Sequence, residues 1–214
     1  MAEPTDNDRT VSAAGAAPWY ARDYVWAFST YFTEGFPFTL IRTVSAVFFR
    51  DMKVSLEAIG LTSLYGLPWV LKFLWSPQVD QFGTKRRWMV SLQLALVCVM
   101  GLAAVFAPLS WGPQAIAALF FAGAVLAATM DIAIDGYYLE ALDKQGQARY
   151  VGYRVMAYRI AMMTGTGVIV TVGALASWWT AFALAAAIFG LFFLYHLFFL
   201  REVQTPAHPM RDLF

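Results

Sequence analysis

The stretch ATMDIAIDGYYLEALDKQGQARYVGYRVMAYRI, residues 128–160, decides how the rest of the chain is interpreted. It places Asp131, Asp135, Arg154 and Arg159 inside segments that otherwise predict membrane-spanning helices. An ionisable side chain at the centre of a bilayer costs roughly 2.5–3.5 kcal/mol on insertion scales, so such groups are expected to be paired or functional. The first question is therefore how these four charges are arranged.

Composition indicates an integral membrane protein. Of the 214 residues, 60% are hydrophobic and 14% are charged, whereas a soluble domain carries about 25% charged residues. The net charge is +1 and no basic runs alternate with aromatic residues, which argues against nucleic-acid binding. The single cysteine, Cys98, excludes an intrachain disulfide. No Ser-His-Asp set, metal-ligand cluster or phosphate-binding loop is visible, so we expect no enzymatic activity, metal or cofactor.

Six apolar segments have the length of about 20 residues that a membrane-spanning helix needs. Pro37 is expected to kink the first segment, and the Ser55 side chain to cap the second. We predict an all-α membrane protein with one six-helix domain over residues 19–200. The polar residues 1–18 predict a disordered tail, and residues 201–214 a second tail or the start of a linker. The six segments are 24–49, 56–75, 88–107, 113–141, 149–176 and 178–200.

Basic residues in the loops predict the orientation, because Lys and Arg are enriched in cytoplasmic loops. Both chain ends and the basic loops after the second and fourth segments fall on one side, whereas the other side has only Arg50 and Lys53. Both termini are therefore expected to be cytoplasmic. Lys72 and His196 lie near the same side, where we expect Lys72 to reach the membrane surface and His196 to be interfacial.

The fourth and fifth segments predict an antiparallel helical hairpin whose turn is centred near Gln145. Residues equally far from this turn lie at equal depth, since each helical residue rises about 1.5 Å. This rule pairs Asp131 with Arg159 and Asp135 with Arg154. Two interpretations remain open: a carboxylate, preferably the deeper Asp131, carries a proton, or both pairs are permanent structural ion pairs.

Two further charges, Glu34 and Arg42, lie in the first segment. Arg42 is eight positions after Glu34, which places the two about 80° apart around a helix and about 12 Å apart along it. They cannot pair with each other, so each needs a partner elsewhere.

The loop SPQVDQFGTKRRW, residues 76–88, has the spacing D-x-x-G-x-[RK]-[RK], carried by Asp80, Gly83, Lys85 and Arg86. This spacing resembles the signature between the second and third helices of the major facilitator superfamily (MFS). Ser76 stands where the family has glycine, and Gln81 where it has a basic residue.

The glycine of this loop allows a tight turn, and the basic residues are expected to keep the loop on the cytoplasmic side of the membrane. The resemblance implies that Asp80 tunes the equilibrium between inward-facing and outward-facing states. The alternative is a solvated carboxylate in an ordinary cytoplasmic loop.

Two segments make the resemblance specific to a subgroup of this family. GLPWVLKFLWSPQVD, residues 66–80, and DIAIDGYYLEAL, residues 131–142, are similar to the AmpG-like muropeptide permeases and the related acetyl-CoA transporters. The family is built from two six-helix halves with the substrate site between them, and the chain corresponds to the N-terminal half. The resemblance implies that the first and fourth helices line the central cavity. The cavity candidates are Tyr31, Glu34, Arg42, Asp131 and Asp135.

The expected function is proton-coupled uptake of a polar or anionic metabolite, such as a muropeptide, at the bacterial inner membrane. The alternative is a non-transporting accessory subunit of a respiratory or photosynthetic complex. A single half would expose its charged cavity face to lipid. We therefore expect a partner: a second six-helix half, from the same protein, a second copy or a separate chain, or a larger membrane complex.

Overall fold

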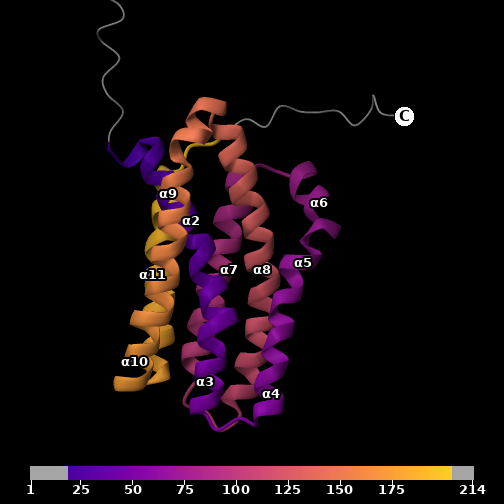
Figure 1. Ribbon diagram of the computed structural model, residues 1–214, viewed down its shortest axis with the longest axis vertical. Coiled ribbons are helices and arrows are strands. Elements are labelled where there is room, and N and C mark those ends of the chain that lie inside the picture. Colours follow the sequence, from indigo (N-terminus) through magenta and orange to yellow (C-terminus); the bar gives the residue numbers. More distant parts are fainter. Residues whose placement is uncertain (1–18, 204–214) are drawn as a thin grey trace, which may run out of the picture.

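Residues 19–203 are described by the computed structural model of the chain, and every regular element over this range is a helix. The helices run side by side as an elongated bundle (Figure 1). A short turn, η2 (Trp19–Ala21), precedes six consecutive helical rods joined by short loops. The all-helical fold class predicted from the sequence is confirmed over these residues.

The first rod is continuous although it contains a proline. It consists of α2 (Asp23–Thr39), the π-helical turn η3 (Leu40–Val44) and α3 (Ser45–Asp51). Pro37 lies in the last turn of α2 and has no N–H group to donate. The π turn follows directly, which is where the helix accommodates the interruption of its hydrogen-bond ladder.

The second rod is broken into short pieces. Pro68 lies at the start of α5 and Pro77 at the start of α6, where a proline is tolerated but interrupts the ladder before it. The Ser55 side chain caps the rod as expected, accepting a hydrogen bond from the Ala58 N–H at 3.3 Å. The pieces are α4 (Leu56–Gly60), η4 (Leu61–Gly66), α5 (Leu67–Leu71), η5 (Lys72–Leu74) and α6 (Ser76–Gln81).

The remaining rods are longer and more regular. They are α7 (Lys85–Phe106); α8 (Gly112–Ala141); α9 (Lys144–Met163), continued by the π-helical η6 (Thr164–Ile169) and by α10 (Val170–Leu175); and α11 (Trp178–Phe199). Within the described residues, four stretches are long and apolar enough to cross a membrane: α7, α8, the rod from α9 to α10, and α11. These identify a multi-pass membrane protein, and crossing by the first two rods stays a prediction.

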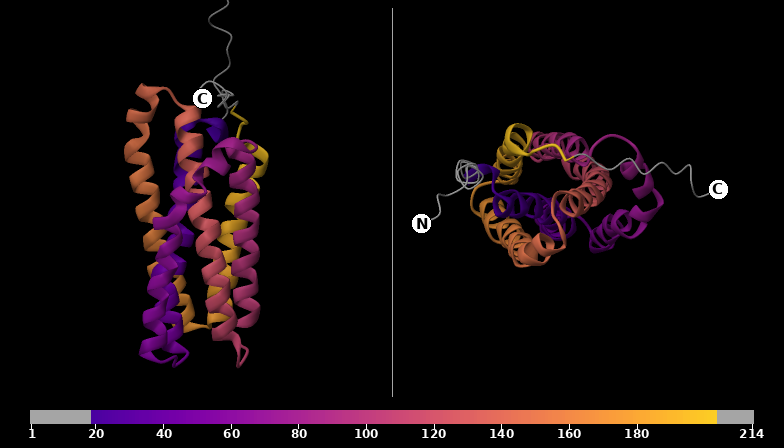
Figure 2. Two further views of the ribbon diagram at one scale, coloured as in Figure 1. Left: turned by 90° about the vertical axis from the view of Figure 1, so that its right-hand side faces the viewer. Right: turned by 90° about the horizontal axis from the view of Figure 1, so that it is seen from above.

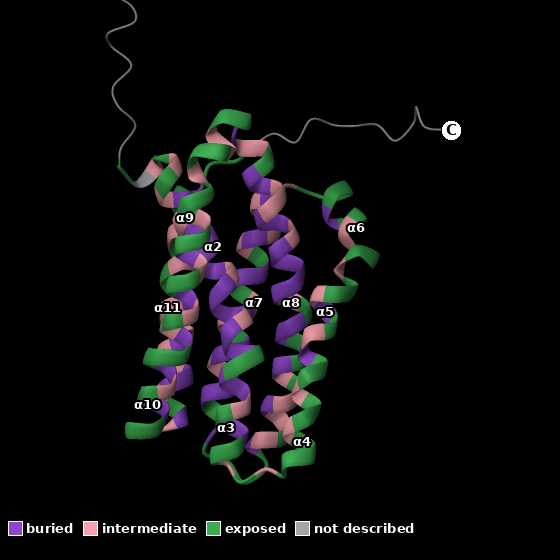
Figure 3. Cartoon of the chain, in the orientation of Figure 1, coloured by how far each residue is buried: buried purple, intermediate pink, exposed green. Residues whose placement is uncertain are grey.

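The core lies between α2, α7 and α8. Helix α2 packs against α8 and α9, and α7 packs against α8 and α11. Figure 3 shows buried residues concentrated on α2, α3, α7 and α8, whereas α4 to α6 and much of α9 are exposed. Large aromatic side chains fill the centre, among them Phe36, Phe48, Phe120, Phe182 and Phe189.

The first rod and the rod from α9 to α10 cross closely at two glycines, Gly35 in α2 and Gly165 in η6. A Cβ atom on Gly35 would lie 3.0 Å from the Tyr158 backbone, and one on Gly165 would lie 2.8 Å from the Thr39 side chain. Small residues allow this close approach of helices in a membrane. The π turns η3 and η6 also contact each other beside the crossing.

Both described chain ends lie at one end of the bundle, together with the turns between α6 and α7 and between α8 and α9 (Figures 1 and 2). We call this the basic end, because it carries Arg22, Lys144 and Arg201. The arrangement agrees with both chain ends being on one side, while the cytoplasmic assignment stays a prediction. The tails expected over residues 1–18 and after residue 203 lie outside the described residues.

A buried polar network joins α2, α7 and α11. The His196 side chain is fully buried, and its Nε2 atom lies 2.9 Å from Ser29 Oγ. Its Nδ1 atom lies 2.8 Å from Gln93 Nε2, which also donates to Thr33 Oγ1 at 3.2 Å. The expectation that His196 is interfacial is therefore wrong. The imidazole satisfies polar groups inside the bundle, where water cannot do so.

We predict that Gln93→Leu destabilises the bundle by about 1–2 kcal/mol, because it leaves His196 and Thr33 without their shared partner. The measurement is reversible unfolding of the purified protein in mixed micelles. Leu94→Ala, at an exposed neighbouring position on α7, is the control and should change stability by less than about 0.5 kcal/mol. Equal stability of Gln93→Leu and wild type would contradict the role of the network.

Candidate functional site

Charged side chains from four rods meet on one side of the bundle. We call this set the charged cluster. The second rod contributes one member, α8 contributes two, and α2 and α9 contribute the others. Its members are Tyr31, Glu34, Lys72, Asp131, Asp135 and Arg154.

The contact between Asp135 and Arg154 is present as the hairpin geometry predicts. Arg154 Nη2 lies 2.8 Å from Asp135 Oδ1, and the Tyr31 hydroxyl donates to the same oxygen at 2.6 Å. The guanidinium group lies over the rings of Tyr31 and Tyr138, at 4.1 and 4.3 Å from their centroids. Ionic, hydrogen-bonding and cation–π contacts thus hold Arg154 in one position between α2 and α8.

Asp131 has a different partner from the one expected. Its carboxylate accepts a hydrogen bond and ion pair from Lys72, in the short turn η5 of the second rod. Arg159 makes no ion pair with any residue that the structure describes, so the predicted pairing of Asp131 with Arg159 is wrong. The expectation that Lys72 extends to the membrane surface is also wrong. Equal depth on two helices does not make two side chains face each other.

Glu34 is the cluster member without a counter-ion at contact distance. Its Oε2 atom is buried and has no hydrogen-bond partner among residues 19–203. The carboxyl group interacts electrostatically with Asp131 and Asp135 and with the arginine that pairs with Asp135. A buried polar oxygen left unpaired is unusual in a folded protein and calls for an explanation.

A pocket of about 390 Å³ lies between α2 and α9 beside the charged cluster. It brings Glu34 together with Arg154 and Arg159, although neither arginine lies on the same helix as the glutamate. The site therefore presents two guanidinium groups and a carboxyl group to one space. The lining residues are Tyr31, Glu34, Val151, Arg154, Val155, Tyr158, Arg159 and Met162.

Arg42 lies apart from this pocket. Its Nη1 atom donates to the Ser63 carbonyl oxygen at 2.9 Å, so it connects the π turn η3 to the second rod. Of the three cavity candidates Glu34, Arg42 and Asp131, only Glu34 is among the residues that line the pocket.

The loop between α6 and α7 is held by a buried lysine. Lys85 Nζ lies 2.5 Å from Asp80 Oδ1 and donates to the Val79 carbonyl oxygen at 3.0 Å. The lysine side chain is only 4% exposed, so it acts inside the protein rather than as a solvated cation. Gly83 has a φ of +73°, a conformation that glycine adopts without strain.

Arg86 connects the same loop to the last span. Its guanidinium group donates to the carbonyl oxygens of Leu197 and Leu200, each at 2.6 Å. These carbonyls belong to the C-terminal end of α11, where cations and donors are favourable. The four residues of the loop signature therefore fix the end of the bundle.

The sequence profile described as Major Facilitator Superfamily matches residues 27–212. The chain belongs to the major facilitator superfamily. Members of this transporter family are generally not enzymes. The signature loop and the helical architecture are those expected of an MFS protein.

Three curated relatives add detail. An uncharacterized protein of Haemophilus influenzae is 33% identical over 77% of this chain, and the anhydromuropeptide permease of Escherichia coli K12 is 29% identical over 64%. A Rickettsia felis protein described as putative transporter AmpG 4 is 26% identical over 74% of the chain. The matched regions cover 41%, 28% and 40% of these relatives, so the MFS chain spans less than half of their length.

Sequence reasoning missed the role of Lys72 in this MFS site. Lys72 lies between Pro68 and Pro77, in a span that also contains Gly66. Hydrophobic segments interrupted by glycine and proline often mark binding regions in transporters, because broken helices turn side chains and backbone toward a cavity. That signal was present in the sequence and would have favoured an inward-facing lysine.

We predict that a double-mutant cycle distinguishes the two possible partners of Asp131. Asp131→Ala combined with Lys72→Ala should show a coupling energy of about 1–3 kcal/mol in the free energy of unfolding, because the two groups are in direct contact. The matched cycle of Asp131→Ala with Arg159→Ala should show a value near zero. A larger coupling with Arg159 than with Lys72 would overturn the pairing seen in the structure.

Proposed function

We propose that the chain is one six-helix half of a proton-coupled MFS permease that takes up a polar, anionic metabolite of the muropeptide class. The observation that carries this proposal is the pocket between α2 and α9. There, Glu34 lines a space shared with two arginines, and its Oε2 atom has no hydrogen-bond partner among residues 19–203. The relatives described as a muropeptide permease and a putative AmpG transporter support the substrate class.

The two arginines have different roles in this proposal. Arg154 is held by Asp135 and two tyrosine rings, so it is a fixed positive wall of the pocket. Arg159 makes no ion pair with a described residue and is free to meet a carboxylate of the substrate. Guanidinium groups bind carboxylates through two parallel hydrogen bonds, which gives both affinity and orientation.

Glu34 is the proposed proton carrier. Asp131 and Asp135 each have a cation at contact distance, whereas Glu34 Oε2 has no hydrogen-bond partner in the described range. At membrane depth a carboxyl group without a counter-ion is buried at less cost when it carries a proton. Asp131, the carrier favoured by the sequence, interacts electrostatically with Glu34.

The rest of the transport pathway requires a second surface. We propose that a second six-helix half covers the face of α9 that lines the pocket beside Glu34, and that the bundle lies in the bacterial inner membrane with its basic end in the cytoplasm. The alternative of a non-transporting accessory subunit is not favoured, because the family and the relatives named above as permeases are transporters.

We predict that Glu34→Gln removes the dependence of uptake on the proton gradient, because an amide cannot take up and release the proton. Uptake of a labelled anhydromuropeptide into membrane vesicles should fall by about tenfold or more under an imposed gradient, equivalent to about 1.4 kcal/mol in the barrier. Exchange of substrate across vesicles without a gradient should persist, which separates proton coupling from substrate binding.

Glu57→Gln is the matched control, since Glu57 is an exposed glutamate in the first turn of α4. It should leave gradient-driven uptake unchanged. Asp131→Asn should abolish both uptake and exchange, because it removes the carboxylate that pairs with the Lys72 ammonium group. Gradient-driven uptake by Glu34→Gln at the wild-type rate would refute the proton role of Glu34.

A further inference from the structure

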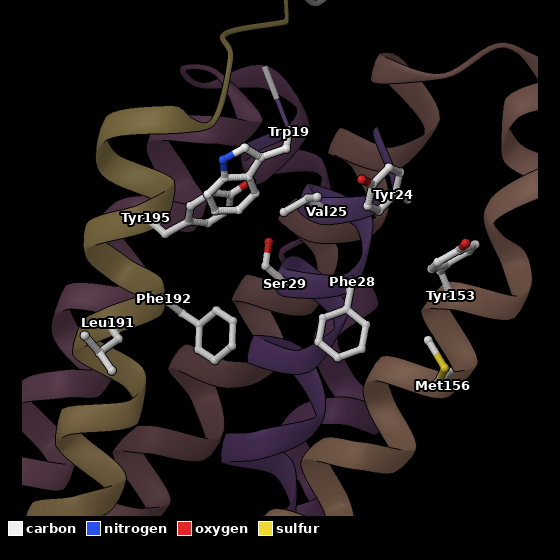
Figure 4. A pocket seen from close by; sticks show the side chains of 10 residues that line it. All are labelled: Trp19, Tyr24, Val25, Phe28, Ser29, Tyr153, Met156, Leu191, Phe192 and Tyr195. Atoms are coloured by element: carbon white, nitrogen blue, oxygen red, sulfur yellow. The ribbon is translucent and has the colours of Figure 1, made fainter. Parts of the chain in front are cut away.

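A second pocket lies at the basic end of the bundle, away from the charged cluster. Its volume is about 470 Å³, within the range of about 300–1,000 Å³ typical of ligand pockets. It is formed by η2, α2, α9 and α11 and shares no lining residue with the pocket beside Glu34. We call it the aromatic groove (Figure 4).

The groove is amphipathic along its length. Four large aromatic residues that carry a hydroxyl group or an indole N–H lie toward the basic end: Trp19, Tyr24, Tyr153 and Tyr195. Farther into the bundle, Phe28, Phe192, Leu191 and Met156 form an apolar lower part (Figure 4). Tryptophan and tyrosine prefer the interface between hydrocarbon and headgroups, where one end of the ring is apolar and the other is wet. The groove thus follows the polarity of one membrane leaflet.

The side of the groove is open at the surface of the bundle. Leu191 on α11 is 69% exposed and Met156 on α9 is 46% exposed. Both helices belong to rods that are long and apolar enough to cross a membrane. The material next to such an opening in a membrane is lipid hydrocarbon, so an acyl chain can enter sideways without crossing a polar region.

Two arginines come shortly before lining residues of the groove in the sequence, one on α9 and one at the N-terminus of α2. Arg149 is four residues before Tyr153 on α9, which places both on the same face of that helix. Arg22 caps α2 three residues before Val25, another lining residue. Asp23, the residue after Arg22, is paired with Arg201 at 3.1 Å.

We propose that the aromatic groove binds an anionic phospholipid. One acyl chain lies between α9 and α11 on the α2 wall, and the phosphate group lies at the mouth beside Arg149 and Arg22. Basic residues at the cytoplasmic ends of transmembrane helices bind anionic headgroups in this way. The site is separate from substrate transport and does not depend on the proposed function.

Other occupants fit the groove less well. The chain's own residues 1–18 contain Glu3, Asp6, Asp8 and Arg9 and no long apolar run, so their composition does not suit a hydrocarbon-lined space. A polar substrate would find only ring hydroxyls, an indole N–H and Ser29 as partners, and the Ser29 hydroxyl already bonds within the bundle.

The test is native mass spectrometry of the purified protein titrated with two lipids of identical acyl chains, phosphatidylglycerol and phosphatidylcholine. We expect phosphatidylglycerol to bind at least about fivefold more tightly, the ratio that corresponds to about 1 kcal/mol for one basic residue near a phosphate. Arg149→Gln should remove most of this preference. Since Arg149 is exposed, its replacement does not disturb the core.

Leu191→Trp should fill the groove and weaken the binding of both lipids by a similar factor. The matched controls are Lys53→Gln at the opposite end of the bundle and Leu102→Trp on an exposed face of α7, and both should bind like wild type. Equal affinity of wild type for the two lipids, or unchanged binding in Leu191→Trp, would overturn the proposal. Dissociation of a dimer by Leu191→Trp, with lipid binding unchanged, would instead identify the groove as a contact between two copies.

Discussion

A charge in the interior of a membrane protein needs a partner, and this requirement organises the bundle. Asp135 and Arg154 connect α8 to α9, and Lys72 connects the second rod to α8. Each contact joins segments from different rods, so the ion pairs also determine which helix faces meet. Losing one member would leave its partner as an unpaired charge, which lipid hydrocarbon cannot stabilise.

The same requirement explains why the second rod is irregular. A continuous α-helix would give its side chains one fixed rotation relative to α8. The breaks at Pro68 and Pro77 place Lys72 in a separate short turn, from which it reaches Asp131. The second rod thus loses helical hydrogen bonds at its breaks but gains the ion pair between Lys72 and Asp131. Among the carboxyl groups of the charged cluster, this arrangement leaves Glu34 without a cation at contact distance in the described part of the chain.

The sequence predicts well how deep a residue lies along its helix, and poorly which neighbouring helix its side chain faces. Hydropathy and the hairpin rule place Asp135 and Arg154 at the same depth. The two side chains also face each other across the hairpin of α8 and α9. The same rule failed for Asp131, because its partner comes from a rod whose breaks cannot be oriented from periodicity. Lys85 and His196 were expected near water, since their sequence distance from the span ends is small. Both are buried by neighbours distant in sequence, which hydropathy does not describe.

The crossing of α2 and α9 limits how the pocket beside Glu34 can change shape. Gly35 packs against the ring and backbone of Tyr158, and Gly165 packs against the Thr39 side chain, so closely that neither glycine has room for a Cβ atom. Drawing the two helices apart would open a void that lipid and water fill poorly. The two walls can therefore slide or pivot against each other but not part. The π turn η6 contains Gly165, and the π turn η3 follows directly after Thr39, so both interruptions of the regular helices lie at this crossing.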